Sequence, residues 1–151
     1  MGYVSDLRDK LGHVPIIMTS AGVLIFNPQG QLLLQRRADN HLWAYPGGSM
    51  ELGESFEECA RREALEETGL TCRELKYFAH LSGKDMYYVY DENDEVYIAE
   101  VVFTCTDYTG EMCIQREEVE EQRFFDLDNL PSEISRVSQN AIKLLLAQKR
   151  G

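Results

Sequence analysis

The sequence predicts an α/β fold, an α/β/α sandwich in which a mixed β-sheet lies between helices. Runs rich in β-branched and aromatic residues, typical of strands, alternate with two longer segments of helical composition. With 151 residues, of which 44% are hydrophobic, the chain is long enough to bury a core between such layers. No repeat or low-complexity tract interrupts this order, so we expect a single domain over residues 1–151.

The first part of the chain predicts a short helix and two strands. Ser5 is a suitable N-cap and Gly12 a suitable end for the helix, which belongs to an N-terminal extension of residues 1–14. The apolar runs 16–26 and 31–37 predict antiparallel strands, because the Asn-Pro-Gln-Gly segment between them is typical of a hairpin turn.

The middle of the chain predicts a helix that follows a loop. The loop contains proline and glycines and leads into residues 55–68, which favour a helix throughout, and Gly69 follows as a C-cap. The chain ends with an expected amphipathic helix at 132–151, capped by Ser132. Further strands are expected within residues 72–83, 85–92, 96–108 and 120–131, with a turn at 91–94.

The charge of the chain limits its partners. The 26 acidic residues against 15 Lys and Arg give a formal net charge of −11, so the field of the molecule repels polyanions. A nucleic-acid polymer is therefore not an expected partner. If the substrate is a small anion, a cation has to be recruited to bind it.

The cysteines and the apolar pattern indicate a cytoplasmic protein. The four cysteines form no C-x-x-C pair and have no metal-finger spacing with the three histidines, so reduced thiols are the simpler interpretation. The N-terminus lacks the apolar core of a signal peptide, and no run approaches the roughly 18 apolar residues of a membrane span. We therefore expect no membrane partner.

The segment 47–70, GGSMELGESFEECARREALEETGL, is crowded with acidic residues. It contains seven glutamates, and like charges three or four residues apart destabilise a helix by about 0.2–0.5 kcal/mol per pair. A solvated, charged helix face is the simplest interpretation. That interpretation explains Glu57 and Glu58, which have Arg61 and Arg62 four residues later.

Glu63, Glu66 and Glu67 need another explanation. At about 100° per residue they share one edge of the helix, and no Lys or Arg follows any of them four residues later. This edge adjoins an apolar stripe that permits a close approach to the sheet, so we expect the carboxylates to lie in a cleft. Close, unpaired carboxylates repel one another unless a cation binds among them, and Mg²⁺ prefers oxygen ligands. Because Gly47 and Gly48 have no Cβ, they are expected to bring backbone atoms to the other wall of this site. The apolar stripe consists of Phe56, Ala60 and Ala64.

The spacing of these residues resembles a known motif. The pattern G-x5-E-x7-R-E-x2-E-E-x-G-L, from Gly48 to Leu70, is similar to the Nudix box of the Nudix hydrolase family, which includes MutT-like proteins. Ala64 departs from the family, which usually has a larger aliphatic residue there, and this affects packing more than chemistry. The segments LWAYPGG before the box and RFFDLDNLP after it extend the resemblance over residues 16–131.

The resemblance implies a Nudix-like sandwich and an enzyme, a hydrolase that acts on phosphoric anhydride bonds. The expected reaction is attack of water on a nucleoside diphosphate linked to another moiety, as in a nucleoside triphosphate, a dinucleoside polyphosphate or an ADP-ribose-like compound. Mg²⁺ is the expected cofactor, with Mn²⁺ as an alternative. By the same resemblance, Glu63, Glu66, Glu67 and the carbonyl group of Gly47 are metal ligands. The expected catalytic residues include Glu63 and Arg62, which orients it.

The motif does not fix the general base. The family often uses a further glutamate from a loop or strand after the box, and residues 117–121 contain four glutamates. We favour Glu118 as the catalytic base and as an additional metal ligand, followed by Glu121, because of their distance from the aromatic pair Phe124 and Phe125. A solvated loop acid is the alternative interpretation of each glutamate.

Four residues are candidates for substrate binding. Arg36 and Arg37 end a predicted strand near the loop, where one of them can reach a phosphate, although an exposed strand-end pair is the simpler interpretation. Trp43 flanks the loop and is a candidate to stack on a base. Tyr87, 17 residues after Leu70, resembles a tyrosine that marks dinucleoside polyphosphate hydrolases in the family. Packing in the sheet is the alternative for both aromatic residues.

A non-catalytic module that senses a nucleotide or ADP-ribose on the same scaffold is the second hypothesis. The complete set of carboxylates disfavours it, because sensors tend to lose such residues. In both cases the expected partner is a small-molecule nucleotide, and a homodimer is left open.

Overall fold

The computed structural model describes residues 2–90, 93–114 and 117–150. The helices are α1 (Tyr3–Leu11), α2 (Phe56–Thr68) and α3 (Arg136–Arg150), with a short 3-10 helix η1 (Lys84–Met86). The strands are β1 (Ile16–Ile25), β2 (Leu32–Arg37), β3 (Trp43–Ala44), β4 (Gly47–Ser49), β5 (Thr71–Leu81), β6 (Tyr87–Tyr90), β7 (Asp94–Thr109) and β8 (Val119–Phe125).

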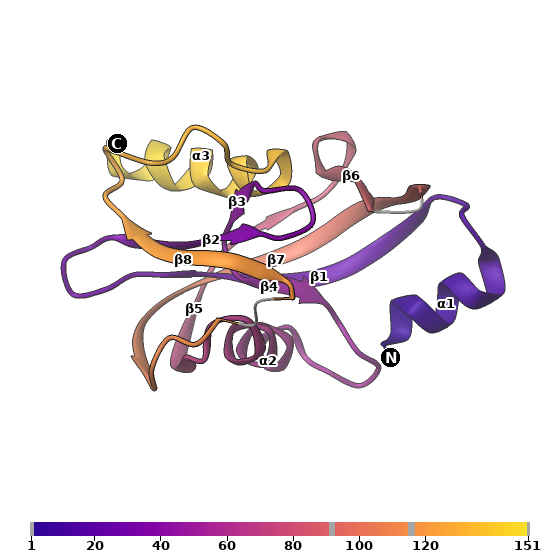
Figure 1. Cartoon of the computed structure of the whole chain (residues 1–151), viewed down its shortest axis with the longest axis horizontal. Coiled ribbons are helices and arrows are strands. Elements are labelled where there is room, and N and C mark those ends of the chain that lie inside the picture. Colours follow the sequence, from indigo (N-terminus) through magenta and orange to yellow (C-terminus); the bar gives the residue numbers. More distant parts are fainter. Residues whose placement is uncertain (1, 91–92, 115–116, 151) are drawn as a thin grey trace.

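The strands form two sheets between α2 and α3. The larger sheet has the order β4-β1-β7-β5, with β6 also paired to β7, and the smaller sheet has the order β3-β2-β8. β1 and β7 run parallel from the pair Ile16 and Val96 to the pair Ile25 and Cys105, whereas the other ladders are antiparallel. Figure 1 shows α2 on one side of the sheets and α3 on the other. The predicted α/β/α sandwich with a mixed sheet is therefore confirmed.

The predicted pairing of the first two strands as a hairpin is wrong. The turn itself forms, since the backbone N–H of Gly30 donates to the carbonyl oxygen of Asn27 at 2.9 Å. Beyond an isolated bridge between Phe26 and Leu32, however, β1 joins β4 and β7 while β2 joins β3 and β8. The reason is burial on both faces, because the first three residues of β2 are all fully buried. Such a strand is stabilised in the middle of the sandwich, between two partners.

The strands predicted in the second half of the chain are confirmed with shifted ends. β5, β7 and β8 lie in the expected regions, and β6 is shorter than expected because η1 occupies the first part of its range. The turn predicted at 91–94 includes residues 91–92, which lie outside the described residues.

Alternation along β1 divides the core into two halves. Ala21, Val23 and Ile25 face α2 and pack with its buried alanines. Leu24, which points to the other face, packs with leucines of β2 and with Ile142 of α3. The small side chains of α2 let its backbone come close to β1 and β4. The glutamates on the adjacent edge of α2 are thereby held at the sheet.

Capping groups set both ends of α2, of which the sequence analysis predicted the C-cap Gly69. The Ser55 hydroxyl accepts a hydrogen bond from the backbone N–H of Glu58 at 3.1 Å, and the Glu58 carboxylate accepts one from the backbone N–H of Ser55 at 2.9 Å. This capping box satisfies two N–H groups that have no partner within the helix. The helix stops at Gly69, whose φ of 82° is left-handed.

The terminal helices differ from prediction at their first residues. α1 begins at Tyr3, two residues before the predicted cap Ser5, although it ends at Gly12 as expected. α3 begins at residue 136, and the hydroxyl of Ser135, rather than that of Ser132, accepts a backbone N–H of its first turn at 3.3 Å. Several serines precede α3, so composition alone does not select the cap.

Alanine at position 69 tests how tightly the end of α2 is packed. A Cβ at Gly69 would lie 2.5 Å from the carbonyl oxygen of Glu111, whereas at Gly53, with a similar φ of 84°, a Cβ would meet nothing within 4 Å. In both variants the left-handed backbone costs about 1–2 kcal/mol. We expect Gly69→Ala to lower the free energy of unfolding in urea by at least about 1 kcal/mol more than Gly53→Ala. Equal losses would contradict the close packing at residue 69.

Candidate active site

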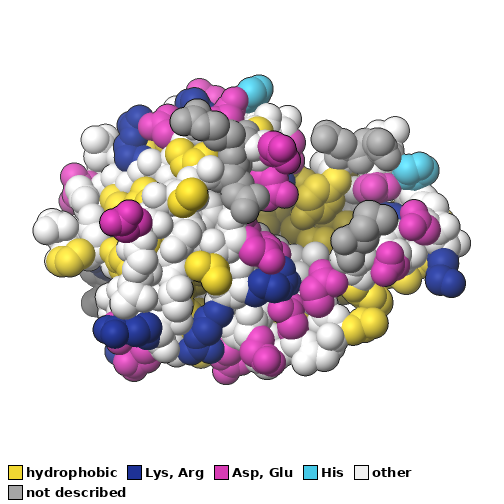
Figure 2. All heavy atoms as spheres, turned by 60° about the horizontal axis from the view of Figure 1, so that its bottom comes forward, with side chains coloured by type: hydrophobic (Ala, Val, Ile, Leu, Met, Phe, Trp, Pro, Cys, Tyr) yellow, Lys and Arg dark blue, Asp and Glu magenta, His cyan; other side chains and the backbone are white. Residues whose placement is uncertain are grey.

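A cleft of roughly 640 Å³ lies where β4, α2 and the start of β8 meet the N-terminal helix. It brings together five of the residues predicted for the site, namely Arg37, Gly47, Glu63, Glu67 and Glu118. Figure 2 shows this hollow between α1 and the body of the molecule, with an apolar floor and acidic side chains around its rim.

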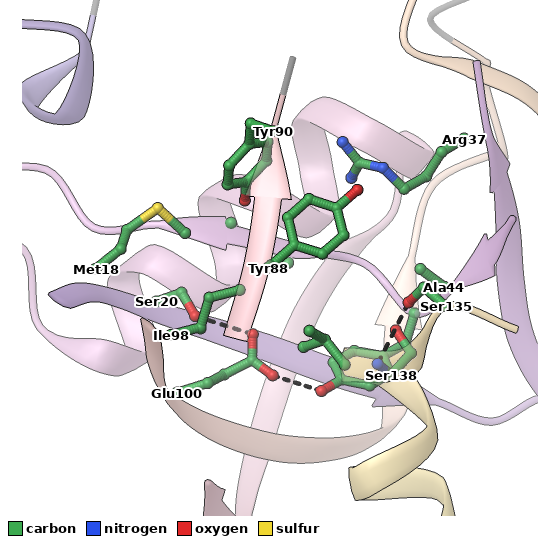
Figure 3. Close-up of a pocket in the computed structure, with 14 residues that line it drawn as sticks. Met18, Ser20, Arg37, Ala44, Tyr88, Tyr90, Ile98, Glu100, Ser135 and Ser138 are labelled. Carbon is green, nitrogen blue, oxygen red and sulfur yellow. Dashed lines mark hydrogen bonds between the residues drawn. The ribbon is translucent and has the colours of Figure 1, made fainter. Parts of the chain in front are cut away.

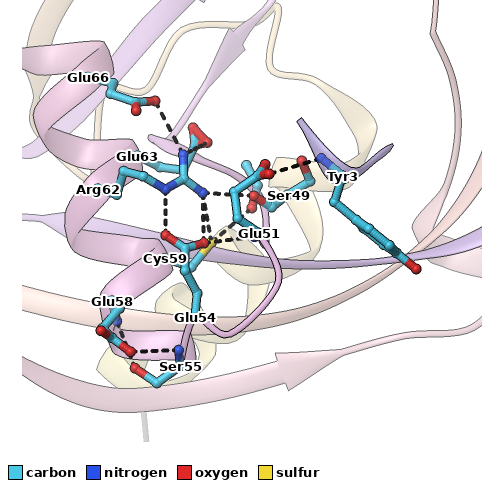
Figure 4. A network of polar contacts seen from close by, with 11 residues as sticks. Tyr3, Ser49, Glu51, Glu54, Ser55, Glu58, Cys59, Arg62, Glu63 and Glu66 are labelled. Atoms are coloured by element: carbon cyan, nitrogen blue, oxygen red, sulfur yellow. Dashed lines mark hydrogen bonds and ion pairs between the residues drawn. The ribbon is translucent and has the colours of Figure 1, made fainter. Parts of the chain in front are cut away.

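Arg62 fixes the carboxylates beside the cleft (Figure 4). Its Nε and Nη2 atoms form a fork on the two oxygens of Glu54, with Nη2 at 2.9 Å from Oε1. Nη2 also donates to the carbonyl oxygen of Ser49 at 3.0 Å, while Nη1 donates to Glu63 at 2.9 Å and to Glu66 at 3.3 Å. The hydrogen bond from Arg62 holds the pKa of Glu54 below its usual value. The expectation that Glu63 and Glu66 lack a basic partner is wrong, because their partner precedes them on the helix.

The expected ion pairs at the start of α2, Glu57 with Arg61 and Glu58 with Arg62, are also wrong for the described residues. Glu58 completes the capping box instead, and Arg62 turns to Glu54. The Arg61 guanidinium donates to two backbone carbonyl groups of β5, at 3.1 and 3.3 Å. Spacing along a helix shows which side chains can meet, and tertiary contacts decide which of them do.

Glu67 is buried against Glu63 at the inner end of the cleft. Its side chain is 8% exposed, its carboxyl group accepts a hydrogen bond from the side-chain amide of Gln35, and its backbone carbonyl accepts one from Gln122 at 2.6 Å. Burial raises the pKa of the Glu67 carboxyl group, and the carboxyl group of Glu63, within hydrogen-bond reach, raises it further. A cation bound beside the Glu67 carboxyl group would offset this penalty on its charged form.

The chemistry of these groups fits a hard divalent cation. Glu63 and Glu67 offer carboxylate oxygens on one side, and the side-chain oxygen of Gln35, also buried there, has no partner among the described residues. A Cβ at Gly48 would lie 2.5 Å from the Glu63 carboxylate, so glycine leaves the room that this side chain occupies. No three Asp, Glu, His or Cys side chains of the described chain already form a metal-binding cluster. Glu66, 56% exposed in its side chain, is turned toward Arg62.

The carbonyl group of Gly47 points away from β1. Backbone hydrogen bonds from Val23 to Pro46 and from Met50 to Thr19, both at 3.0 Å, define the hydrogen-bonded pairs of this antiparallel ladder. Because such pairs alternate with unbonded ones, Gly47 opposite Gly22 is an unbonded pair. Its carbonyl oxygen therefore faces the free edge of β4, on the same side as the Ser49 carbonyl that Arg62 binds.

Arg37 is the cation of the inner cleft. Its guanidinium group donates to both oxygens of Asp39, at 3.0 and 2.9 Å. Burial lowers the pKa of Arg37, but the hydrogen bond and charge of Asp39 outweigh burial, and the pKa is raised above its usual value. The positive charge is thus permanent and held near the Glu67 carboxyl group, whose pKa it lowers.

The two candidate bases occupy different surfaces. Glu118 is exposed and lines the cleft, and its backbone carbonyl accepts a hydrogen bond from Ala38 at 2.9 Å. Glu121 binds Arg123 and lies 3.7 Å from Arg36, on a separate groove. The position of Glu118 in the cleft therefore favours it over Glu121 as the general base, and this role remains a prediction.

Three predicted substrate-binding residues are not brought to the cleft. Trp43 is only 7% exposed and meets the ring of Phe125 edge-on at 4.9 Å. The guanidinium group of Arg36 lies over Trp43, 5.7 Å from the ring centre. Tyr87, which does not line the cleft, donates its hydroxyl to Glu95 at 2.7 Å. These positions agree with the alternatives given above, which are packing in the sheet for Trp43 and Tyr87 and a position at the end of a strand for Arg36.

The sequence did not predict that α1 forms one wall of the cleft. The backbone N–H of Tyr3 donates to Glu51 at 2.9 Å, and Arg8 donates to the carbonyl oxygen of Glu95 at 2.7 Å. No residue of α1 is buried, so the helix adds to the wall rather than to the core. The role of Gln35 was missed as well, although a polar residue directly after three leucines was a usable signal. The residues of α1 that line the cleft are Val4, Ser5, Arg8 and Asp9.

Comparison with known proteins places these observations in a family. The family model described as NUDIX domain matches residues 17–146. A putative 8-oxo-dGTP diphosphatase of Bacillus subtilis is 48% identical over 64 residues, which are 42% of this chain and 38% of that protein. An RNA pyrophosphohydrolase of Proteus mirabilis is 42% identical over 60 residues, 40% of this chain and 34% of that protein. The matches thus span little more than a third of the curated relatives' length.

Solved structures agree in fold. A MutT Nudix hydrolase from Burkholderia pseudomallei superposes with a TM-score of 0.73 at 21% identity, over 87% of this chain and 98% of its own. A MutT protein from Methanosarcina mazei gives a TM-score of 0.74 at 22% identity, over 91% and 97%. Among the described residues, no helix has the length and apolar character needed to cross a membrane.

Lysine at position 62 tests the role of the guanidinium fork. Lysine keeps the charge but cannot bind both oxygens of Glu54 while reaching Ser49 and Glu63. We expect Arg62→Lys to lower the free energy of unfolding by about 1–3 kcal/mol. Arg61→Lys, next to it, loses two bonds to backbone carbonyl groups and breaks no ion pair, so it should cost less than about 1 kcal/mol. Guanidinium denaturation of both variants measures the difference, and similar costs would refute the central role of Arg62.

Proposed function

Because the chain belongs to the NUDIX domain family, we propose that it is a pyrophosphohydrolase that cleaves a phosphoric anhydride bond in a nucleoside diphosphate linked to another moiety. The observation that carries the proposal is the pair of buried Glu67 and half-buried Glu63 in a cleft beside the Gly47 backbone. Relatives described as an RNA pyrophosphohydrolase and a putative 8-oxo-dGTP diphosphatase support the reaction class. The net charge of −11 favours a small nucleotide over an RNA chain as substrate.

The cofactor of the proposal is Mg²⁺, with Mn²⁺ as an alternative. Glu63, Glu67 and the carbonyl oxygen of Gly47 would hold it, together with Glu66 once that side chain leaves Arg62, and with Glu118 from the other wall. When bound, the metal supplies charge neutralisation for the diphosphate and lowers the pKa of water. Half of the Glu66 side chain is exposed, so its rotation displaces little packing.

Three side chains of the protein have separate roles in the proposed reaction. Arg62 acts as a positioning residue, because the fork to Glu54 fixes the guanidinium group whose Nη1 atom orients Glu63. Glu118, an exposed carboxylate that faces the cleft, takes the proton of the attacking water. Arg37, which is paired with Val119 and so lies beside Glu118, binds phosphate oxygens, which stabilises the charge that develops on the diphosphate.

A second candidate function, a non-catalytic nucleotide sensor, gains no support from the comparisons. A cytoplasmic setting also belongs to the proposal, supported by the thiol state of Cys59, Cys72, Cys105 and Cys113. A homodimer stays a prediction.

Glutamine at position 67 tests the proposal. Glu67→Gln keeps the size of the side chain but removes a carboxylate, so we expect the rate of anhydride hydrolysis, followed by chromatography of the products of a nucleotide panel with Mg²⁺, to fall at least about 100-fold. Glu57→Gln, on the exposed first turn of the same helix, should retain the rate. Thermal unfolding gives a readout without turnover, since Mg²⁺ should raise the melting temperature of the wild type but not of Glu67→Gln.

Two outcomes would refute the proposal. Full activity of Glu67→Gln would exclude the carboxyl pair as the site, and tight nucleotide binding without any turnover of the wild type would favour the sensor. For active enzyme, hydrolysis in heavy-oxygen water identifies the phosphorus that is attacked.

A further inference from the structure

A second pocket adjoins the cleft on the side of β6 and α3 (Figure 3). Its enclosed part is about 70 Å³, enough for one edge of a heterocyclic base but not for a nucleotide. Arg37, Gly47, Gly48, Met18 and Tyr90 line both the pocket and the cleft. A ligand with its phosphates in the cleft can therefore extend into this pocket without crossing the core.

The walls of the pocket suit a flat ring. Tyr88 and Tyr90 of β6 meet edge to face with ring centres 4.7 Å apart, and the amide of Asn40 donates to the Tyr88 hydroxyl at 2.8 Å. Met18 and Ile98 supply apolar surface on the strands beneath. Aromatic side chains and methionine are effective partners for the faces of bases.

Glu100 of β7 lies at the floor of the pocket, where the hydrolytic reaction has no use for it. It is 8% exposed, and its two oxygens accept hydrogen bonds from different hydroxyl groups, Oε1 from Ser20 at 2.9 Å and Oε2 from Tyr45. Figure 3 shows the Glu100 carboxyl group with the Ser20 hydroxyl beside it. Burial raises the pKa of Glu100, while the hydroxyl groups of Tyr45 and Ser20 act in the opposite direction. A carboxylate oxygen can accept two hydrogen bonds, and among the described residues each oxygen of Glu100 accepts one.

We propose that this pocket takes the base of the nucleotide, and that Glu100 selects guanine or a guanine derivative over the other bases. The proposal rests on the proposed function and names its substrate class. A carboxylate presents two acceptors side by side, and guanine is the base whose edge presents two adjacent N–H donors, at N1 and N2. Adenine and cytosine place an acceptor beside their amino group, and uracil and thymine place carbonyl groups beside their single N–H. Each of these would set an acceptor against Glu100, an unpaired contact that is costly in a buried site.

The first test uses the wild-type protein and three nucleoside 5′-monophosphates, so it needs neither hydrolysis nor a variant. Titration calorimetry should give the affinity order GMP, then IMP, which lacks the N2 amino group, then AMP. We expect at least a tenfold difference between GMP and AMP, since hydrogen bonds to a charged acceptor are involved. Equal affinities, or a preference for AMP, would overturn the proposal.

Three amino-acid substitutions test whether Glu100 is the residue that selects guanine. Glu100→Gln replaces one acceptor by a donor and should reduce the GMP-to-AMP affinity ratio at least tenfold. Glu74→Gln, a matched change at an exposed residue of β5, should leave the ratio unchanged. Tyr88→Leu should weaken both ligands about fivefold or more and leave their ratio unchanged, because stacking does not distinguish the bases. If Glu100→Gln does not fold by circular dichroism, the ligand series and Tyr88→Leu still decide.

The binding experiments and the hydrolysis assay test different proposals, so either proposal can fail while the other stands. Base selection with no turnover would support the pocket and refute the proposed reaction. Turnover of a nucleotide panel without preference for guanine would leave the reaction standing and refute the role of Glu100.

Discussion

The close approach of α2 to β1 and β4 is the constraint on which the site depends. Ala60 and Ala64 are fully buried against the sheet, and a Cβ at Gly48 of β4 would lie 2.5 Å from the carboxyl group of Glu63 on α2. Larger residues at these places would push the helix outward. The helix edge that carries Glu63 and Glu67 would then move away from the β4 backbone. The same small residues that pack the core thus set the distance between the two walls of the cleft.

This packing buries polar groups at the site, which lowers the free energy of unfolding. The Glu67 carboxyl group lies in an interior where burial and the neighbouring carboxyl group both disfavour its charge. Around it, the side-chain oxygens of Gln35 and Gln122 are buried without partners among the described residues. Polar groups left in this state lower the free energy of unfolding. A site that binds a cation and an anionic ligand recovers this energy when it is filled.

The sequence predicts those features that depend on residues close together in the chain. The limits of α2 can be predicted from sequence because the contacts at each end are local. Ser55 and Glu58 cap the first turn, and Gly69 caps the last turn. The shared edge of the carboxylates also follows from helical geometry. The ion pairs of Glu63 and Glu66 with Arg62 are also of short range, since Arg62 lies within one helical turn before both glutamates.

Features that depend on distant parts of the chain were not predictable. The separation of β1 and β2 into two sheets is decided by β7 and β8, which lie far along the sequence. The pocket around Glu100 likewise combines residues of β1, β6, β7 and the start of α3, and no local pattern links them. Trp43 was a candidate by its place beside the loop and Tyr87 by its spacing from the motif, and neither signal contains the contacts with Phe125 and Glu95 that hold these side chains away from the cleft.

The parallel ladder between β1 and β7 also has a consequence for the kinetics of folding. Every pair in this ladder joins residues 80 positions apart, and β4, which carries the glycines of the cleft, is held in the sheet by β1. Contacts of such long range form late, after the entropy of closing a large loop has been overcome. α2 can form early from its own caps, but its carboxylates meet the β4 backbone only when β1 has found β7. The cleft is therefore expected to be among the last parts of the molecule to assemble.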